Sequence, residues 1–422
     1  MTTLRSSYLF DAALETQDAP ASAAYLGARL RAALRHAYDH APRLKAQWDG
    51  LGVKPDAVQS PADLHLLPVT RKDELASIQS TALPFGGLNS VAVEKMARVF
   101  ISPGNIYDPQ GAAADFWRFA PALAAAGFRA GDLVLNTFSY HMTPAGFMFD
   151  GALRHLGCVV VPTGVGQTEQ QVRIASDLAV TGFVGTPSFL YTLLTKAREL
   201  NTPLKIEVAF VTAEMLPPSL RAELENDFGI RVLQGYGTAD LGMLAYECPQ
   251  KDGMHLHPEC IVEILDLETR QPAEPGQPGE VVATIFDEAY PLIRFATGDV
   301  SSWSNPTACS CGRTAPKLSG ILGRVGDAVK VKGLFIRGSQ MDSVIKQFPE
   351  VAKYQAIVTR DQHQDQLRYV VELARGMPGD ALPERLAEAL RSELKVRGEV
   401  EIVAFGSLPQ GAKKIDDRRV WK

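Results

Sequence analysis

The sequence predicts an α/β protein with a large N-terminal domain of helix-covered sheets plus a β region, and a small, mobile α+β C-terminal domain. Between about residues 90 and 240, short apolar runs alternate with helix-like stretches, which is typical of parallel strands covered by helices. The Pro/Gly-rich residues 268–279 then lead into an apolar run, which favours a turn into an antiparallel β region. The pattern changes again near residue 323, so we place the domains at residues 1–322 and 323–422.

The composition is that of a globular protein without an obvious charged partner. The chain has 422 residues, of which 46% are hydrophobic and 22% charged, enough for a sizeable core. Its formal net charge of −5 argues against nucleic acid or an anionic membrane surface as the main partner. No stretch approaches the roughly 18–20 apolar residues that span a bilayer, and no targeting segment is evident. We therefore expect a cytoplasmic protein.

Individual elements follow from the periodicity of the apolar residues. Residues 21–40 repeat Leu26, Leu30, Leu34 and Ala37 at helical spacing, and Pro42 ends that helix. Further helices are expected over residues 116–128, 168–180, 218–229 and 382–396. Buried strands are expected broadly over residues 92–102, 131–138, 157–164, 182–188, 207–213 and 231–237.

Four motifs occur in a characteristic order: QGYGTAD (234–240), PLIRFATGD (291–299), GRVGDAVKVKG (323–333) and LPQGAKK (408–414). Together they resemble the adenylate-forming superfamily. The segments GVGQTEQQVRIASDL (164–178) and CSCGRTAPKLSGILGR (309–324) have the look of its phenylacetate–CoA ligase branch. The resemblance covers nearly the whole chain.

The resemblance implies a two-step reaction with ATP, Mg²⁺ and coenzyme A. A carboxylic acid, aromatic or arylacetic in this branch, attacks the α-phosphate of ATP, and a thiol then attacks the acyl-adenylate. Both steps need negative charge neutralised and the reactants held in line. The small domain is expected to rotate between the steps, and a homodimer is expected.

In similar enzymes, the aspartate that matches Asp299 accepts hydrogen bonds from both ribose hydroxyls, which suits an acceptor-only side chain. The alternative is an ordinary turn aspartate after Gly298. Arg294 either belongs to the same loop or lies on the surface.

The QGYGTAD motif is expected to hold the adenine. Tyr236 would stack on the base, and Gly235 and Gly237 would let the backbone approach it. The family usually places Ser or Thr and then Glu at the end of this motif, where this chain has Ala239 and Asp240.

Two further features match the family's nucleotide side. Asp240 can still ligate Mg²⁺, and Thr238 is a candidate for the missing hydroxyl. Ala213 and Glu214, which follow an expected strand, match the family's other adenine-side segment.

The domain junction and the C-terminus supply the remaining family positions. Arg324 matches a ribose- and hinge-side arginine, and the hinge position itself falls at Gly326, followed by Asp327. Lys414 is the candidate for the catalytic lysine of the adenylation step, and Lys413 is the neighbouring alternative. A pair of solvated lysines without a catalytic role is the other possibility.

The phosphate loop departs from the family pattern. Family members carry a Ser/Thr/Gly-rich loop that ends in Gly-Lys-Pro and cradles the β- and γ-phosphates. Residues 102–109 keep Ser102, Gly104 and Pro109 in step with it, but Asp108 stands where the lysine is expected. A carboxylate there repels a triphosphate. Three interpretations follow: phosphates held elsewhere, a different nucleotide pose, or weakened catalysis.

The cysteines and histidines indicate a metal site. Cys248, His255, Cys309 and Cys311 form a Cys-x₆-His pair and a Cys-x-Cys pair, which fits a closed tetrahedral site for structural Zn²⁺. His257 is an alternative to His255, and buried free thiols are the alternative to a metal site. The other two cysteines, Cys158 and Cys260, are expected in the core.

Loops after the expected strands are candidates for the acyl pocket. Phe138, Tyr140, His141 and Pro187 lie where the resemblance places that pocket, and their apolar, partly aromatic character suits a hydrophobic acid. Two other functions stay open: an adenylyltransferase that works without coenzyme A, and a non-catalytic homologue that binds nucleotide or acyl-adenylate.

Overall fold

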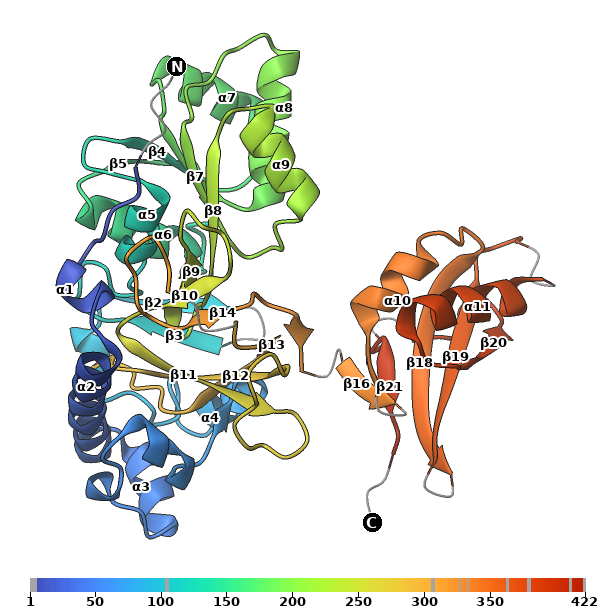
Figure 1. Cartoon of the computed structure of the whole chain (residues 1–422), viewed down its shortest axis with the longest axis horizontal. Coiled ribbons are helices and arrows are strands. Elements are labelled where there is room, and N and C mark those ends of the chain that lie inside the picture. The colour runs from blue at the N-terminus through green and yellow to red at the C-terminus, as the bar shows by residue number, and fades with distance from the viewer. Residues whose placement is uncertain are drawn as a thin grey trace. The chain divides into compact units, whose positions relative to one another are not determined.

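The computed structural model of the chain describes residues 6–102, 106–304, 308–325, 328–331, 334–361, 364–377, 381–409 and 412–419. The chain divides into two compact units, Met1–Leu322 and Gly323–Lys422. Each unit combines helices with sheets, which confirms the predicted α/β class (Figure 1). No helix among the described residues combines the length and the apolar character that crossing a membrane requires.

An eight-stranded mixed sheet forms the centre of the first unit. In spatial order it contains β14 (Lys317–Leu318), β10 (Met254–Leu256), β9 (Gly242–Glu247), β8 (Arg231–Thr238), β7 (Val208–Val211), β6 (Gly182–Gly185), β4 (Leu133–Asn136) and β5 (Val159–Pro162). The strands from β5 to β8 pair in parallel, and those from β8 to β14 pair antiparallel.

Helices cover both faces of the parallel strands because successive side chains of a strand point to opposite faces. On β4, Val134 packs in one apolar cluster with α5 (Ala120–Ala126) and α6 (Ala145–His155). Leu135, the next residue, packs in another with α7 (Thr168–Asp177), α8 (Pro187–Glu199) and α9 (Pro218–Asn226) (Figure 1). With both faces covered, β6 and β7 are buried throughout.

Two details differ from the sequence-based expectations. The strand β5 lies at the edge of the sheet, and Val159 is 55% exposed, so this apolar run is not a buried strand. The helix expected from residue 116 begins only at Ala120, because Arg118 adopts a left-handed φ of 62° that a helix cannot contain. The carboxylate of Asp115 accepts hydrogen bonds from the backbone N–H groups of Phe119 and Ala120 and so caps the shorter helix.

A second sheet and a hairpin complete the β structure of the first unit. The sheet contains β1 (Thr70–Arg71), β13 (Phe295–Ser301), β12 (Gly279–Ile285) and β11 (Cys260–Asp266) in spatial order. The pairings β13–β12 and β12–β11 are antiparallel, as the Pro/Gly-rich turn predicts. The hairpin pairs β2 (Arg98–Ser102) with β3 (Ile106–Gln110).

The N-terminal part of the first unit is helical. It contains α1 (Ala12–Glu15), α2 (Ala19–His40), α3 (Pro42–Gly50), η1 (Pro55–Ala57), η2 (Pro61–Leu66), η3 (Lys72–Glu74), α4 (Leu75–Ser80) and η4 (Val93–Lys95). The predicted long helix is α2, and it buries Leu30, Leu34 and Ala37 as the periodicity indicates.

The second unit is a small α+β structure with its own core. Its elements are β15 (Gly323–Arg324), β16 (Ala328–Val331), β17 (Leu334–Arg337), α10 (Gly338–Ile345), β18 (Val351–Asp361), β19 (Gln364–Leu373), α11 (Leu382–Leu394), β20 (Glu399–Val403) and β21 (Ile415–Asp417). The order β20–β19–β18–β21 forms the main sheet. Residues Leu382, Leu386, Leu390 and Leu394 give α11 an apolar face that packs in the core of this unit.

A buried ion pair fastens residues 8–15 to the rest of the first unit. Arg313 Nε donates to Glu15 Oε2 at 2.6 Å, and the two side chains are only 2% and 1% exposed. Arg313 also donates to the carbonyl of Tyr8, and the Tyr246 hydroxyl lies 3.2 Å from the same Glu15 oxygen. Removing one charge from such a pair leaves its partner buried and unpaired.

We expect Glu15→Gln to lower the free energy of unfolding of the first unit by about 3–5 kcal/mol, measured by urea denaturation followed by fluorescence. Glu199→Gln is the matched control, since Glu199 and Lys196 are also 2.6 Å apart but 57% and 32% exposed. It should cost under about 1 kcal/mol. Equal losses in the two variants would contradict the assigned role of burial.

Candidate nucleotide site and metal centre

The adenine-side motif and the predicted ribose-binding aspartate meet in the structure. The hydroxyl of Tyr236 on β8 donates to Asp299 Oδ2 on β13 at 2.8 Å and lies 3.1 Å from Thr297 Oγ1. The backbone N–H of Asp299 in turn donates to Thr297 Oγ1 at 3.0 Å. Two motifs 63 residues apart in sequence therefore form one polar cluster where the two sheets meet. Thr297 is a member that sequence reasoning did not single out.

The two glycines of the motif are explained by packing. They lie in β8, which pairs with β9. A Cβ at Gly235 would approach the Phe210 ring to 2.6 Å, and one at Gly237 would approach the Gly242 carbonyl oxygen to 2.6 Å. Both positions exclude any larger residue for reasons within the fold, whatever the ligand.

The turn after β8 places Asp240 in a buried position. Thr238 Oγ1 accepts a hydrogen bond from the Leu241 N–H, so the Thr238 hydroxyl helps to close the turn. Trp117 Nε1 donates to the carbonyl of Ala239 at 3.1 Å. Asp240 Oδ2 accepts from Lys72 Nζ at 2.5 Å, and the Asp240 side chain is fully buried.

The other adenine-side candidates are exposed. Ala213 follows β7 with a left-handed φ of 70°, and its side chain and that of Glu214 both face solvent. The neighbouring Thr212 hydroxyl donates to the carbonyl of Gly235 at 2.8 Å, which ties this segment to β8.

Arg294 directly precedes β13 and does not lie on the surface. Its guanidinium donates to both oxygens of Glu263 at 2.8 and 3.0 Å and to the carbonyl of Leu67 at 2.7 Å. The residue is 6% exposed. The expectation of a surface role is therefore wrong, because Arg294 is a buried structural residue.

The altered phosphate loop lies in the β2–β3 hairpin. Pro103, Gly104 and Asn105 lie outside the described residues, whereas Tyr107, Asp108 and Pro109 are part of β3. Asp108 is 2% exposed, and neither of its carboxylate oxygens has a hydrogen-bond partner among the described residues. Burial first, and then the charge of Asp240, raise the pKa of Asp108 from 3.8 to about 7, against smaller lowering effects of the nearby Ser102 hydroxyl and of the Lys72 charge.

A segment that the sequence did not mark holds this hairpin. On α4, the Gln79 amide donates to the carbonyl of Tyr107 and accepts from its N–H, both at 2.8 Å. The same segment carries Lys72 on η3. No spacing or motif distinguishes Lys72 among the charged residues 71–74, so only the fold could reveal it.

In the second unit, the candidate catalytic lysine is engaged. Lys414 Nζ forms an ion pair with Asp342 on α10 at 2.5 Å, and Tyr354 donates to the other oxygen of Asp342. Lys413 is exposed, and its carbonyl accepts from the Gln355 amide. Asp342 is another residue that sequence reasoning missed.

Of the predicted junction residues, the structure describes Arg324. The Arg324 side chain is exposed at the start of the second unit, in β15. Gly326 and Asp327, the predicted hinge, lie outside the described residues.

The acyl-pocket candidates differ in exposure. Phe138 is buried and stacks on Phe149 at 4.8 Å, and Pro187 is buried as the first residue of α8. The Tyr140 hydroxyl accepts from the Asn136 amide and donates to Asp150, while His141 is exposed.

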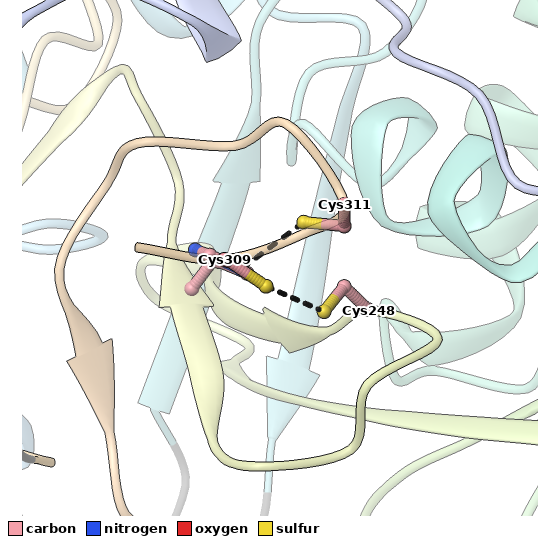
Figure 2. Close-up of side chains that lie close together, drawn as sticks. Cys248, Cys309 and Cys311 are labelled. Carbon is pink, nitrogen blue, oxygen red and sulfur yellow. Dashed lines mark hydrogen bonds between the residues drawn. The ribbon is translucent and has the colours of Figure 1, made fainter. Parts of the chain in front are cut away.

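The predicted metal ligands come together as a compact cluster. Cys248 follows β9, His255 lies on β10, and Cys309 and Cys311 lie in the loop before β14. Their ligand atoms all lie within 4.8 Å of one another. The Cys248 and Cys309 sulfurs are 3.5 Å apart (Figure 2). The Cys311 sulfur is 3.4 Å from His255 Nε2.

The surroundings of the cluster suit a metal. His255 Nδ1 lies 2.9 Å from the carbonyl of Ala315, which fixes the proton on Nδ1 and turns Nε2 toward the sulfurs. His257 is buried and accepts from the Glu259 N–H through Nδ1, and it is not part of the cluster, so it does not replace His255. Cys158 and Cys260 are buried elsewhere, as expected.

Comparisons with known proteins agree with this geometry. Residues 110–284 match the AMP-binding enzyme family model, and residues 333–420 match the AMP-binding enzyme C-terminal domain. The first match begins just after the altered loop. A phenylacetate-coenzyme A ligase of Aromatoleum evansii is 32% identical over 387 residues, which cover 87% of this chain and 85% of that protein. One of Thermus thermophilus is 29% identical over 416 residues, covering 90% and 92%.

A solved structure extends the likeness to both units. A crystal structure of 2-hydroxyisobutyryl-CoA ligase in the postadenylation state, in complex with 2-HIB-AMP, is 25% identical to this chain with a TM-score of 0.74. The likeness covers 96% of this chain and 91% of that one.

Proposed function

Because the chain belongs to the phenylacetate–coenzyme A ligase family of AMP-binding enzymes, we propose that it is an ATP-dependent acid–CoA ligase. A carboxylate oxygen of the substrate bonds to the α-phosphorus of Mg-ATP, and pyrophosphate leaves. The thiol sulfur of coenzyme A then bonds to the acyl carbon, AMP leaves, and the thiol proton passes to solvent. The observation that carries the proposal is the 2.8 Å contact between Tyr236 and Asp299.

Within this proposal, Asp299 binds the ribose. A carboxylate is an acceptor-only group that suits two neighbouring hydroxyls. The Tyr236 hydroxyl donates to this carboxylate, and the Asp299 backbone N–H donates to Thr297 Oγ1. The two hydrogen bonds hold Asp299 in place. We assign Arg324 to the domain junction. The residues assigned to the adenine side are Ala213, Glu214, Gly235, Tyr236, Gly237 and Thr238.

Lys414 is assigned to the adenylation step. A compact ammonium stabilises charge that develops between the acid and the α-phosphate. Its ion pair with Asp342 must then be exchanged for substrate during the reaction. Since Lys414 is 53% exposed, that exchange costs little desolvation.

The proposed substrate is an aromatic or arylacetic acid. The support is that both relatives named above are phenylacetate-coenzyme A ligases, and that Phe138, Tyr140 and Pro187 are apolar or aromatic. His141 is assigned to the rim of the acyl pocket. The setting that we propose is the cytoplasm, and the assembly a homodimer, which light scattering of the purified protein tests.

A second candidate function is a non-catalytic homologue that binds nucleotide or acyl-adenylate. The observation that favours it is Asp108, an acidic group at the position where the family places a phosphate-binding lysine. An adenylyltransferase without coenzyme A is the remaining alternative. Turnover measurements separate the three.

The Cys/His cluster is proposed to hold structural Zn²⁺. Three thiolates and one imidazole complete a tetrahedral shell, so no position is left for a substrate. The role is structural: Zn²⁺ would fasten the loop that carries Cys309 and Cys311 to β9 and β10.

The ligase proposal predicts pyrophosphate release that requires both ATP and a carboxylic acid, tested with a panel of aryl and arylacetic acids. Asp299→Ala should weaken AMP binding, measured by calorimetry, about 100-fold, since it removes two hydrogen bonds to a charged acceptor. AMP binding without any turnover would favour the non-catalytic function. Absence of both ATP and AMP binding would contradict the proposal altogether.

Lys414→Ala should slow acyl-adenylate formation about 100-fold or more, measured by pyrophosphate release in single turnover. Thioester formation from added acyl-adenylate and coenzyme A should change little, because the second step does not need this ammonium. Lys413→Ala is the neighbouring control. If it is the slow variant instead, the assignment moves to Lys413.

The protein purified from zinc-containing medium should carry about one zinc ion per chain by elemental analysis. Cys309→Ser and Cys311→Ser should each lose most of it and lower the melting temperature, because the loop is then no longer held. Cys158→Ser should retain full zinc, since Cys158 lies outside the cluster. Full zinc in all three variants would exclude this site.

A further inference from the structure

The altered phosphate loop leaves an unusual set of buried oxygen atoms. Both oxygens of Asp108 and Oδ1 of Asp240 are buried, and none has a hydrogen-bond partner among the described residues. Asp108 is 2% exposed and Asp240 7%. Burying a carboxylate oxygen without a partner is costly, and such atoms are rare in folded proteins. A group that binds them is therefore expected.

The two carboxylates lie close enough for the charge of Asp240 to act on Asp108. Asp240 contributes to the raised pKa of Asp108, and the charges of both raise the pKa of the nearby Tyr290 hydroxyl, behind the effect of its burial and against that of Gln79. Gln79, 3.2 Å from that hydroxyl, holds Tyr107 and so fixes the position of Asp108 on β3. The arrangement is preformed by β3, the β8–β9 turn and α4.

An ammonium group, that of Lys72, accompanies these carboxylates. Lys72 Nζ lies 2.5 Å from Asp240 Oδ2, the one oxygen of the four that has a partner. Its side chain is 27% exposed, whereas that of Asp240 is fully buried. Lys72 therefore pairs with one aspartate and leaves three acceptor oxygens, which are the ligand type that Mg²⁺ prefers.

We propose that Asp108 and Asp240 together bind the divalent cation of the nucleotide site, so that the cation replaces the lysine missing from the phosphate loop. Asp108 is thereby a metal ligand and no longer a group that repels the triphosphate. Mg²⁺ commonly combines one or two carboxylates with substrate phosphates. That a nucleotide supplies the cation's other ligands rests on the proposed ligase function. Binding of the cation to the two aspartates does not.

Lys72 has a defined part in this arrangement. Its ammonium lies beside the same carboxylates and repels an incoming cation, so it weakens metal binding when no nucleotide is present. Once a triphosphate arrives, the ammonium has an anionic partner of its own. Removal of Lys72 should therefore strengthen binding of the bare cation, which a purely structural ion pair would not do.

The test is a Mn²⁺ titration of the full-length protein without nucleotide or acid, with free Mn²⁺ measured by electron paramagnetic resonance. Asp108→Asn and Asp240→Asn should each weaken Mn²⁺ binding about tenfold or more, and Lys72→Met should strengthen it several-fold, as expected for charges within a few ångströms of the ion. Asp177→Asn, at the exposed end of α7, should bind Mn²⁺ like the wild type. Thermal melts verify that each variant is folded.

Binding of Mn²⁺ that is unchanged in Asp108→Asn overturns the inference, as does a lack of binding in both the wild type and Lys72→Met. If Asp240→Asn fails to fold, the Asp108→Asn and Lys72→Met pair still decides. Pyrophosphate release separates this inference from the ligase proposal. A protein that binds Mn²⁺ through both aspartates but never releases pyrophosphate loses only the ligase function, whereas an active ligase with Mn²⁺ affinity independent of Asp108 loses only this inference.

Discussion

The hydroxyl of Tyr236 connects the two sheets of the first unit, because Tyr236 lies on β8 of the eight-stranded sheet and Asp299 on β13 of the second. Helices cover both faces of the parallel strands in the first sheet, and the second sheet shares an apolar cluster with the N-terminal helices. The polar contact is made where the two sheets meet, so the orientation of the Asp299 carboxylate depends on how both sheets pack. The position of one side chain thus reflects the packing of the whole unit, and a function that needs a fixed carboxylate is best placed there.

The fold was largely predictable because its signals are local. The runs that form β6 and β7 are continuously apolar, and α2 and α11 repeat leucine at helical spacing. Local signals failed where a neighbour decides the outcome. The run that forms β5 looks buried in sequence but lies at a sheet edge, and Arg118 shortens the helix that follows it.

The site was predictable to the extent that its residues lie in ordered motifs. Cys248, His255, Cys309 and Cys311 were identified from residue type alone, and the fold brings them together. Lys72 and Asp240 are 168 residues apart, and neither position predicts the other. The same holds for Asp342 beside Lys414, where residues 72 apart form an ion pair. An ion pair between residues far apart in sequence is a property of the folded chain, so a sequence motif can show that a lysine is missing but not which charged groups lie near its position.

The loop with Cys309 and Cys311 also holds the beginning of the chain, through Arg313 to Glu15 and Tyr8 and through the backbone of Thr314 to Glu15. If the proposed Zn²⁺ were lost, this loop would hold Glu15, which lies almost 300 positions earlier, less firmly. Exposed chain ends are where proteases begin. If the cluster holds zinc as proposed, the lifetime of the protein would therefore depend on the zinc supply, through a role that is structural.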